Sequence, residues 1–147
     1  MKKTIIIFSL LLSTGLSEVF ANEKVSPDQK TLDGFKKEFI AAQSVTWEKQ
    51  GDFDKATFLL SGHRVIAWFN TAGQLEGCIR DIFFDQLPLI VMTAVDKRFT
   101  GADIYSVREI TKNEVAYYSI TLETKNKKYN IKVGSSGTID EVEKVSN

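Results

Sequence analysis

The sequence contains few residues that bind transition metals or cross-link a chain. Its 147 residues include one cysteine, Cys78, and one histidine, His63. A single cysteine excludes an internal disulfide, and one histidine leaves a zinc site in need of several acidic partners. Cys78 alternates with Arg80 and Ile82, so we expect it half-buried in a strand as a small hydrophobe. We expect no metal and no cofactor, and a fold stabilised by its core.

Motifs of nucleotide-binding and hydrolytic enzymes are also missing. The sequence has no phosphate-binding glycine loop, no GxSxG motif and no dinucleotide fingerprint. Ser61, His63 and Asp54 could be written as a triad, but they flank a hairpin without evident oxyanion donors. Asp52 and Asp54 begin a strand, where carboxylates are normally solvated. We therefore predict a non-enzymatic protein and keep, as the alternative, a small envelope hydrolase that uses Asp52 and Asp54.

The chain carries no excess of either charge. It has 19 basic and 19 acidic residues, and the one short basic cluster, Lys125, Lys127 and Lys128, lies at an expected hairpin tip. Binding to nucleic acid depends on clustered Lys and Arg that neutralise phosphates. The composition therefore argues against a nucleic-acid partner.

Long apolar runs are missing except at the N-terminus. Two lysines precede an apolar stretch at residues 5–12, and Val19-Phe20-Ala21 places small residues where signal peptidase cleaves. The apolar stretch is far shorter than the roughly 20 residues that span a bilayer. We predict a cleavable signal peptide at residues 1–21 and a periplasmic or secreted protein.

The mature chain predicted by this cleavage spans residues 22–147. It begins with Asn22 rather than cysteine, so we expect no lipid anchor and no membrane anchor after cleavage. Removal of the signal leaves 17 basic and 18 acidic residues, a net charge near −1. This length suits one domain or two small units with a substantial core.

A first helix is predicted after the signal peptide. Residues 26–29, Ser-Pro-Asp-Gln, have the pattern of a capping box with Ser26 as the N-cap. Apolar residues then recur at helical spacing through Phe35 and Phe39. The pattern predicts a helix from Ser26 to about Ala42.

A second helix is predicted midway along the chain. Pro88 suits the first turn of a helix, and Val95 and Phe99 continue a buried stripe from Val91 or Met92. Gly101 stands where a left-handed residue commonly ends a helix.

The rest of the mature chain alternates with the period of β-strands. Antiparallel strands are expected between residues 45 and 84, separated by Gly-containing turns. Further strands are expected at residues 104–111, 115–123, 128–133 and about 138–145. The helix-and-strand order thus occurs twice.

The two halves resemble each other in sequence as well. Val65, Ala67 and Phe69 align with Tyr129, Ile131 and Val133 at an offset of 64, whereas the two helices are offset by 60. We predict an α+β fold of two tandem repeats, about residues 26–84 and 85–147, each a helix followed by antiparallel strands. A chance likeness of alternating strands is the other interpretation.

Three short motifs carry a family resemblance. They are Phe39 followed by Val45-Thr46-Trp47, Ala67-Trp68-Phe69 before a Gly-containing turn, and Leu87-Pro88 before the second helix. With these motifs the chain resembles the PepSY-like family of secreted bacterial proteins, related in fold to β-lactamase inhibitory protein (BLIP). The resemblance implies a continuous antiparallel sheet with helices on one face and protein binding on the other. It does not imply inhibition of a β-lactamase.

A candidate binding surface follows from strand alternation. If Phe58 and Phe69 face the helices, then Leu59, Ile66, Trp68 and Tyr117 face the opposite way. Exposed aromatic residues on a rigid sheet favour protein binding. We predict that this face binds an envelope protein or peptide, unless a loop, the C-terminal tail or a partner subunit covers it. A small-ligand carrier, which would need a closed apolar pocket, and the oligomeric state both stay open.

Overall fold

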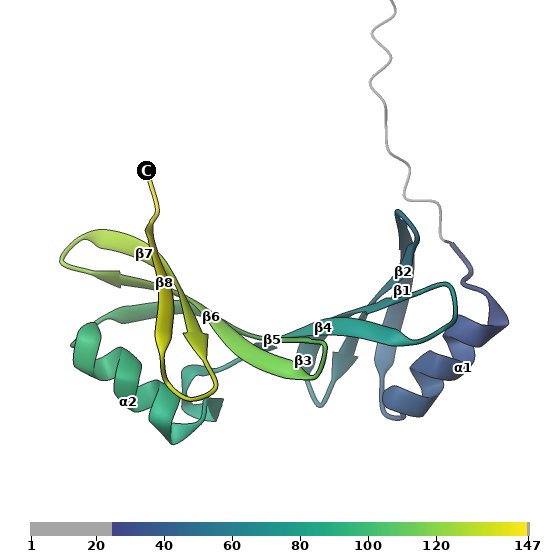
Figure 1. Ribbon diagram of the computed structural model, residues 1–147, viewed down its shortest axis with the longest axis horizontal. Coiled ribbons are helices and arrows are strands. Elements are labelled where there is room, and N and C mark those ends of the chain that lie inside the picture. Colours follow the sequence, from purple (N-terminus) through teal and green to yellow (C-terminus); the bar gives the residue numbers. More distant parts are fainter. Residues whose placement is uncertain (1–24, 147) are drawn as a thin grey trace, which may run out of the picture.

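A computed structural model describes residues 25–146, in which a helix followed by four strands occurs twice (Figure 1). The elements are α1 (Gln29–Glu38), β1 (Gln43–Gln50), β2 (Phe53–Leu60), β3 (His63–Phe69), β4 (Leu75–Ile82), the 3-10 turn η1 (Phe84–Gln86), α2 (Leu89–Arg98), β5 (Asp103–Lys112), β6 (Val115–Thr124), β7 (Lys127–Gly134) and β8 (Ile139–Lys144). The signal peptide predicted at residues 1–21 lies outside the described residues.

All eight strands form one antiparallel sheet in chain order, from β1 to β8. β4 pairs with β5, and this pairing joins the two repeats into a continuous sheet. The helices lie toward opposite ends of the molecule, with the β4–β5 region between them (Figure 1). The predicted α+β fold with two helix-and-strand repeats is confirmed.

Helix α1 begins later than the sequence pattern suggested, and its N-cap lies two residues further along the chain. Asp28 is its N-cap, and its carboxylate accepts a hydrogen bond of 2.9 Å from the backbone N–H of Thr31. The prediction of Ser26 as the cap is therefore wrong: an aspartate caps as well as a serine, and Asp28 is the residue in reach of the first turn. The helix ends at Glu38 rather than near Ala42, because Phe39 leaves helical geometry with φ −128°.

Helix α2 begins at Leu89, and Pro88 is its N-cap rather than its first residue. Its predicted buried stripe is confirmed, since Val91 and Val95 are fully buried and Phe99 is nearly so. Gly101 adopts the left-handed φ of +70° after the helix. Within residues 25–146, no helix has both the length and the apolar character needed to span a bilayer.

Each repeat has its own hydrophobic core beneath its helix. The first core consists of Phe35, Ala56, Phe58, Val65, Ala67 and Phe69. The second core consists of Ile82, Leu87, Val91, Val95, Phe99, Val107, Tyr118, Ile120, Leu122, Ile131 and Val133. Directly paired residues point to the same face of a sheet. Val65 of the first core is linked to Tyr118 of the second core through the paired residues Arg80 and Glu109. Both cores, and both helices, therefore lie on one face of the sheet.

The strand register confirms the repeat and locates its irregularity. Asp54 pairs with Phe69 in the first repeat, and Tyr118 pairs with Val133 in the second. Each residue of the second pair lies 64 positions after its counterpart in the first. Two residues separate the pair Gln50↔Phe53 in the β1–β2 hairpin, whereas six separate the pair Ile110↔Tyr117 in the β5–β6 hairpin. The longer second hairpin accounts for the change of offset from 60 at the helices to 64 at the later strands.

Candidate functional site

The sheet face opposite both helices is the candidate functional site, and we call it the open face. Three neighbouring rows of residues cross its middle strands, β3 to β6, in direct register. Leu59, Ile66, Trp68 and Tyr117, the four residues predicted from the sequence, all lie on this face. All four are partly or fully exposed, and Leu59 has an exposed fraction of 40%.

The middle row, which we call the apolar row, consists of Ile66, Ile79, Ile110 and Tyr117. Ile66 pairs with Ile79, Ile79 with Ile110, and Ile110 with Tyr117. Each of these side chains is partly exposed. Ile66 and Tyr117, which were predicted from the sequence, therefore lie at the two ends of this row. Sequence reasoning missed Ile79 and Ile110, which form its centre.

A second row contains a hollow, which we call the Gly77 hollow. Trp68 pairs with Gly77 and Gly77 with Lys112, so the missing side chain of glycine leaves a gap between two large neighbours. The hollow measures about 530 Å³, and Phe53 and Ile79 contribute to its largely apolar wall. The indole N–H of Trp68 donates a 2.9 Å hydrogen bond to Gln50, which fixes the orientation of the ring.

The third row is charged and includes two arginines that share one carboxylate. Arg64 Nη1 lies 3.6 Å from Asp81 Oδ2, and Arg108 Nε lies 3.4 Å from Asp81 Oδ1. Both arginine side chains are about half exposed. Leu59 pairs with Arg64 at one end of this row, beside rather than within the apolar row.

The open face continues over the second repeat with a more polar surface. Lys132 lies with its Nζ 4.8 Å from the centre of the Tyr117 ring and 3.3 Å from Glu141. Thr121 donates a 2.8 Å hydrogen bond to Asn130 on the neighbouring strand. The exposed apolar side chains of the open face therefore lie on β2 to β6, on both sides of the junction of the two repeats.

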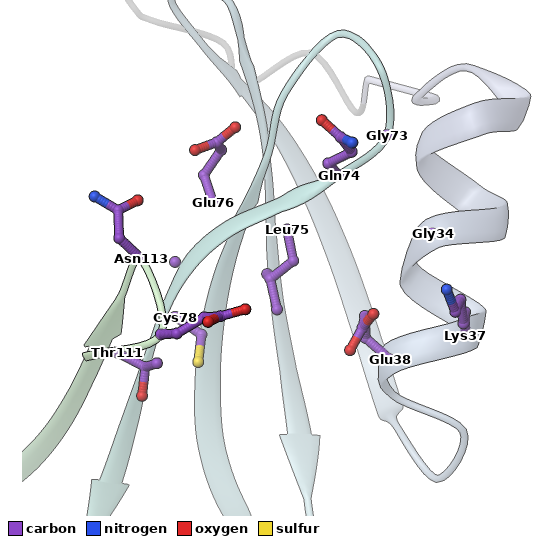
Figure 2. A pocket seen from close by; sticks show the side chains of 12 residues that line it. Gly34, Lys37, Glu38, Gly73, Gln74, Leu75, Glu76, Cys78, Thr111 and Asn113 are labelled. Carbon is purple, nitrogen blue, oxygen red and sulfur yellow. The ribbon is translucent and has the colours of Figure 1, made fainter. Parts of the chain in front are cut away.

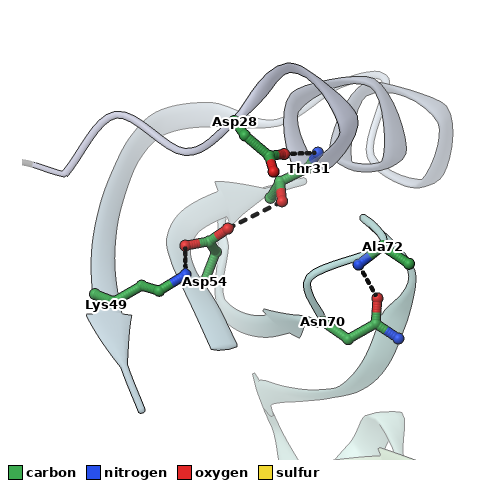
Figure 3. Close-up of polar contacts among 6 residues, drawn as sticks. All are labelled: Asp28, Thr31, Lys49, Asp54, Asn70 and Ala72. Carbon is green, nitrogen blue, oxygen red and sulfur yellow. Dashed lines mark hydrogen bonds and ion pairs between the residues drawn. The ribbon is translucent and has the colours of Figure 1, made fainter. Parts of the chain in front are cut away.

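The carboxylates of the alternative hydrolase do not form an acid/base pair. Asp54 is buried with an exposed fraction of 6%, so the expectation of a solvated strand-end carboxylate is wrong for this residue. One oxygen accepts a 2.9 Å hydrogen bond from the Thr31 hydroxyl, and the other lies 3.0 Å from Lys49 Nζ (Figure 3). The carboxylate faces the helix-covered side because its position on β2 alternates with the open face. Asp52 is exposed in the preceding turn.

The residues of the formal triad are also separated. His63 pairs with Leu60 at the end of β2 opposite to Asp54. Its ring lies 3.2 Å from the side-chain amide of Gln86 and packs edge-on against Phe83. Among residues 25–146, no cluster of three or more His, Cys, Asp and Glu side chains could hold a metal ion.

A second hollow lies on the helix-covered side and contains the cysteine. It measures about 690 Å³ and opens between α1, the β3–β4 turn and the β5–β6 hairpin (Figure 2). Lys37, Glu38 and Asn113 contribute polar groups to a mixed lining, unlike the closed apolar pocket that a small-ligand carrier would need. Cys78 is half-buried in β4, as predicted, and burial raises the pKa of its thiol against a smaller opposing effect of Thr111.

Solved structures share this fold. A DUF2874 family protein from Bacteroides ovatus is 23% identical, with a TM-score of 0.72 over 84% of this chain and 91% of that chain. A BLIP-like protein from Bacteroides fragilis is 20% identical, with a TM-score of 0.73 over 84% and 89%. A protein from Bacteroides eggerthii, provisionally described as periplasmic, is 19% identical, with a TM-score of 0.72 over 84% and 92%. Neither a protein-family model nor a curated protein matches the chain.

These similarities establish the fold. The expected resemblance to BLIP-related proteins is therefore confirmed at the level of the backbone, with about nine-tenths of each related structure matched.

Proposed function

We propose that this chain is an exported, non-enzymatic binding module that engages a protein or peptide through its open face. The observation that carries the proposal is the apolar row, which remains partly exposed across the four central strands. Contiguous apolar surface is uncommon on soluble monomers unless it takes part in binding. Aromatic side chains held rigidly beside such a surface are frequent anchors of protein interfaces.

The rigidity of the surface supports binding of a folded or extended partner. The apolar row stands on a hydrogen-bonded sheet whose opposite side is covered by both cores. Trp68 is held by Gln50 and Tyr117 lies beneath Lys132, so neither aromatic ring has to be ordered when a partner arrives. Preorganised side chains lower the entropic cost of association.

The alternative hydrolase receives less support from the same geometry. Asp54 would have to act while both its oxygens are engaged by Thr31 and Lys49 beneath α1. Screening of the mature chain, residues 22–147, against glycosides and esters tests this alternative. Turnover that disappears in an Asp52→Asn/Asp54→Asn variant would overturn the binding proposal in favour of the hydrolase.

Export is part of the proposal. The predicted signal at residues 1–21 supports it, as does the provisional periplasmic description of the Bacteroides eggerthii protein of similar fold. Fractionation of cells expressing the full chain should place a species lacking the first 21 residues outside the cytoplasm. An uncleaved cytoplasmic species would contradict export without touching the binding proposal.

The binding experiment uses the double variant Trp68→Ala/Tyr117→Ala. Affinity capture from envelope extract with residues 22–147 should recover a partner, and the variant should lose it while its melting temperature stays within a few degrees of wild type. The matched control is Ile40→Ala/Leu89→Ala, which removes exposed apolar side chains that lie outside the open face. A double variant that unfolds would show that the two aromatic residues are part of the core and that the site assignment is wrong.

A further inference from the structure

The open face also indicates the chemistry of its partner. We infer that it binds a protein segment that carries a carboxylate and a large apolar side chain about 13 Å apart. This separation is the length of four residues in an extended strand. This inference rests on the binding function proposed above. The carboxylate would pair with Arg64 and Arg108, and the apolar side chain would enter the Gly77 hollow.

The charges beside the apolar row are unbalanced. On β3 to β6, the row itself and the two rows flanking it carry three cations, Arg64, Arg108 and Lys112, against the single carboxylate of Asp81. Nowhere in residues 25–146 does another carboxylate form an ion pair with either arginine. Asp52 and Glu76 line the Gly77 hollow. The excess of positive charge therefore lies at the Arg64 and Arg108 end of the face, and this end complements an acidic side chain.

The geometry of the two arginines suits a further carboxylate. Their separations from Asp81, 3.6 and 3.4 Å, exceed the 2.7–3.2 Å typical of hydrogen bonds. Both side chains are about half exposed, so their guanidiniums are accessible to a partner. A guanidinium binds a carboxylate through two parallel hydrogen bonds. Two guanidiniums share the single carboxylate of Asp81, so a net charge of +1 is left for the carboxylate of a partner.

The Gly77 hollow supplies the apolar subsite. A Cβ at this position would lie 2.9 Å from the backbone oxygen of Thr111, so the close approach of β4 and β5 requires glycine. The same absence of a side chain opens the space between Trp68 and Lys112. The hollow therefore exists because of how the two repeats join, and its apolar wall suits an aromatic or large aliphatic side chain.

The positions of the two subsites constrain the occupant. Arg64 and Trp68 lie four residues apart on β3, with Ile66 of the apolar row between them. An extended segment that lies along the strands would present residues i, i+2 and i+4 to one side. Such a segment would place a large apolar side chain over the hollow and an aliphatic side chain over the apolar row. Its carboxylate would lie over the arginines. A second copy of this chain that docked with its strands in the same direction would bring the two pairs of arginines together, and so fits less well.

The test selects binders for residues 22–147 from a random dodecapeptide library displayed on phage. We expect enrichment of Asp or Glu four residues from a large apolar residue, and we expect the affinity of the synthesised peptides to fall with salt. Arg64→Gln/Arg108→Gln should weaken these peptides about tenfold, since it removes the charge-assisted hydrogen bonds. Asp81→Asn frees both arginines and should raise the affinity for the same peptides. A purely structural role of the arginines would not produce this effect.

The control variant is Lys36→Glu/Lys97→Glu, which lowers the net charge on the exposed sides of α1 and α2 and should leave peptide affinity unchanged. Peptides that lose binding with Trp68→Ala but show no acidic preference and no response to the arginine variants would overturn this inference alone. Peptides insensitive to both sets of variants would count against the binding face itself. A library without binders, or a dimer in solution that Ile79→Asp dissociates, would also overturn the inference.

Discussion

At the scale of single residues, a polar pair replaces apolar contacts in the first core. Thr31 and Asp54 are buried and hydrogen-bonded to each other, whereas the equivalent residues of the second repeat, Val91 and Tyr118, belong to its apolar core. The hydroxyl of Thr31 donates to one carboxylate oxygen, and Lys49 neutralises the other. Asp54 therefore holds α1 against β2, and this role explains a carboxylate that sequence alone presented as a catalytic candidate.

Thr31→Val should destabilise the protein although valine has nearly the same shape. The substitution leaves a buried carboxylate oxygen without its donor, which costs about 1–3 kcal/mol of the free energy of unfolding. Urea unfolding followed by tryptophan fluorescence measures the change. Thr93→Val, at an exposed position on α2, is the matched control and should change stability by less than about 0.5 kcal/mol. Equal stability of wild type and Thr31→Val would remove the structural role of Asp54.

The N-cap of α1 should make part of the stability depend on pH. The backbone N–H of Thr31 lowers the pKa of Asp28 below its ordinary value of 3.8. The ionised carboxylate is therefore favoured in the folded state, so its contribution is present above pH 3.8 and is lost as the pH falls through the lowered pKa. Asp28→Ala should lower the urea midpoint at pH 7 and approach wild type in strong acid. Asp28→Asn, a neutral cap, should lose less at pH 7, and a pH-independent difference for Asp28→Ala would contradict the assignment.

At the scale of elements, the packing of α1 against the β3–β4 turn depends on two glycines. A Cβ at Gly34 would collide with the backbone oxygen of Gly73, and Gly73 itself has φ +77° and lies against the backbone of Lys30. Gly137 touches the backbone of Ile90 in the same way in the second repeat. The turn after the third strand of each repeat thus sets how closely its helix can approach.

Gly34→Ala tests this close approach through the sign of its effect. In an unconstrained helix, alanine is more favourable than glycine by about 0.8–1.0 kcal/mol. Here the added methyl must displace backbone, so we expect a loss of about 1–3 kcal/mol in the free energy of unfolding. Gly134→Ala is the control, since its Cβ would make only ordinary contacts of 3.6 Å or more. A stabilised Gly34→Ala variant would show that α1 lies farther from the turn.

Alternation predicted the strands and the helix-free face, but β-bulges concealed the centre of the candidate site. Counting in twos from Leu75 or from Ile104, both of which pack on the cores, assigns Ile79 and Ile110 to the helix-covered face. Counting back from Ile82 assigns Ile79 to the open face, so alternation alone leaves β4 ambiguous. Register shifts at Trp68/Phe69 and Ile104/Ser106 insert one extra residue in β4 and one in β5. Each extra residue reverses the faces of the residues after it in the strand. Periodicity finds strands, whereas bulges depend on pairing that one strand does not reveal.

The charged row was hidden from the sequence for a different reason. Arg64, Asp81 and Arg108 are far apart along the chain, and each reads as an ordinary solvated residue within its own strand. They meet only because β4 pairs with β3 on one side and with β5 on the other. The same holds for the Gly77 hollow, whose walls come from strands of both repeats.

At the scale of the whole molecule, β4 connects two cores that are otherwise separate. Leu75 and Cys78, near its start, pack on the first core, and Ile82, at its end, belongs to the second. β4 is held across the junction by six residue pairs with β5 and by the 2.8 Å ion pair between Arg80 and Glu109. Loss of either core therefore removes a strand from the other, and we expect the two repeats to unfold together.

The distribution of chromophores allows a direct test of this coupling. Both tryptophans, Trp47 and Trp68, lie in the first repeat, and all four tyrosines lie between residues 105 and 129 in the second. Phe58→Ala opens a cavity in the first core, which costs about 3–5 kcal/mol. Tryptophan fluorescence and tyrosine absorbance should give one common urea midpoint in wild type, and both should shift equally in the variant. A tyrosine transition that stays in place while the tryptophan transition moves would mean that the β4–β5 ladder is too weak to couple the repeats, and that the open face at their junction is not a rigid surface.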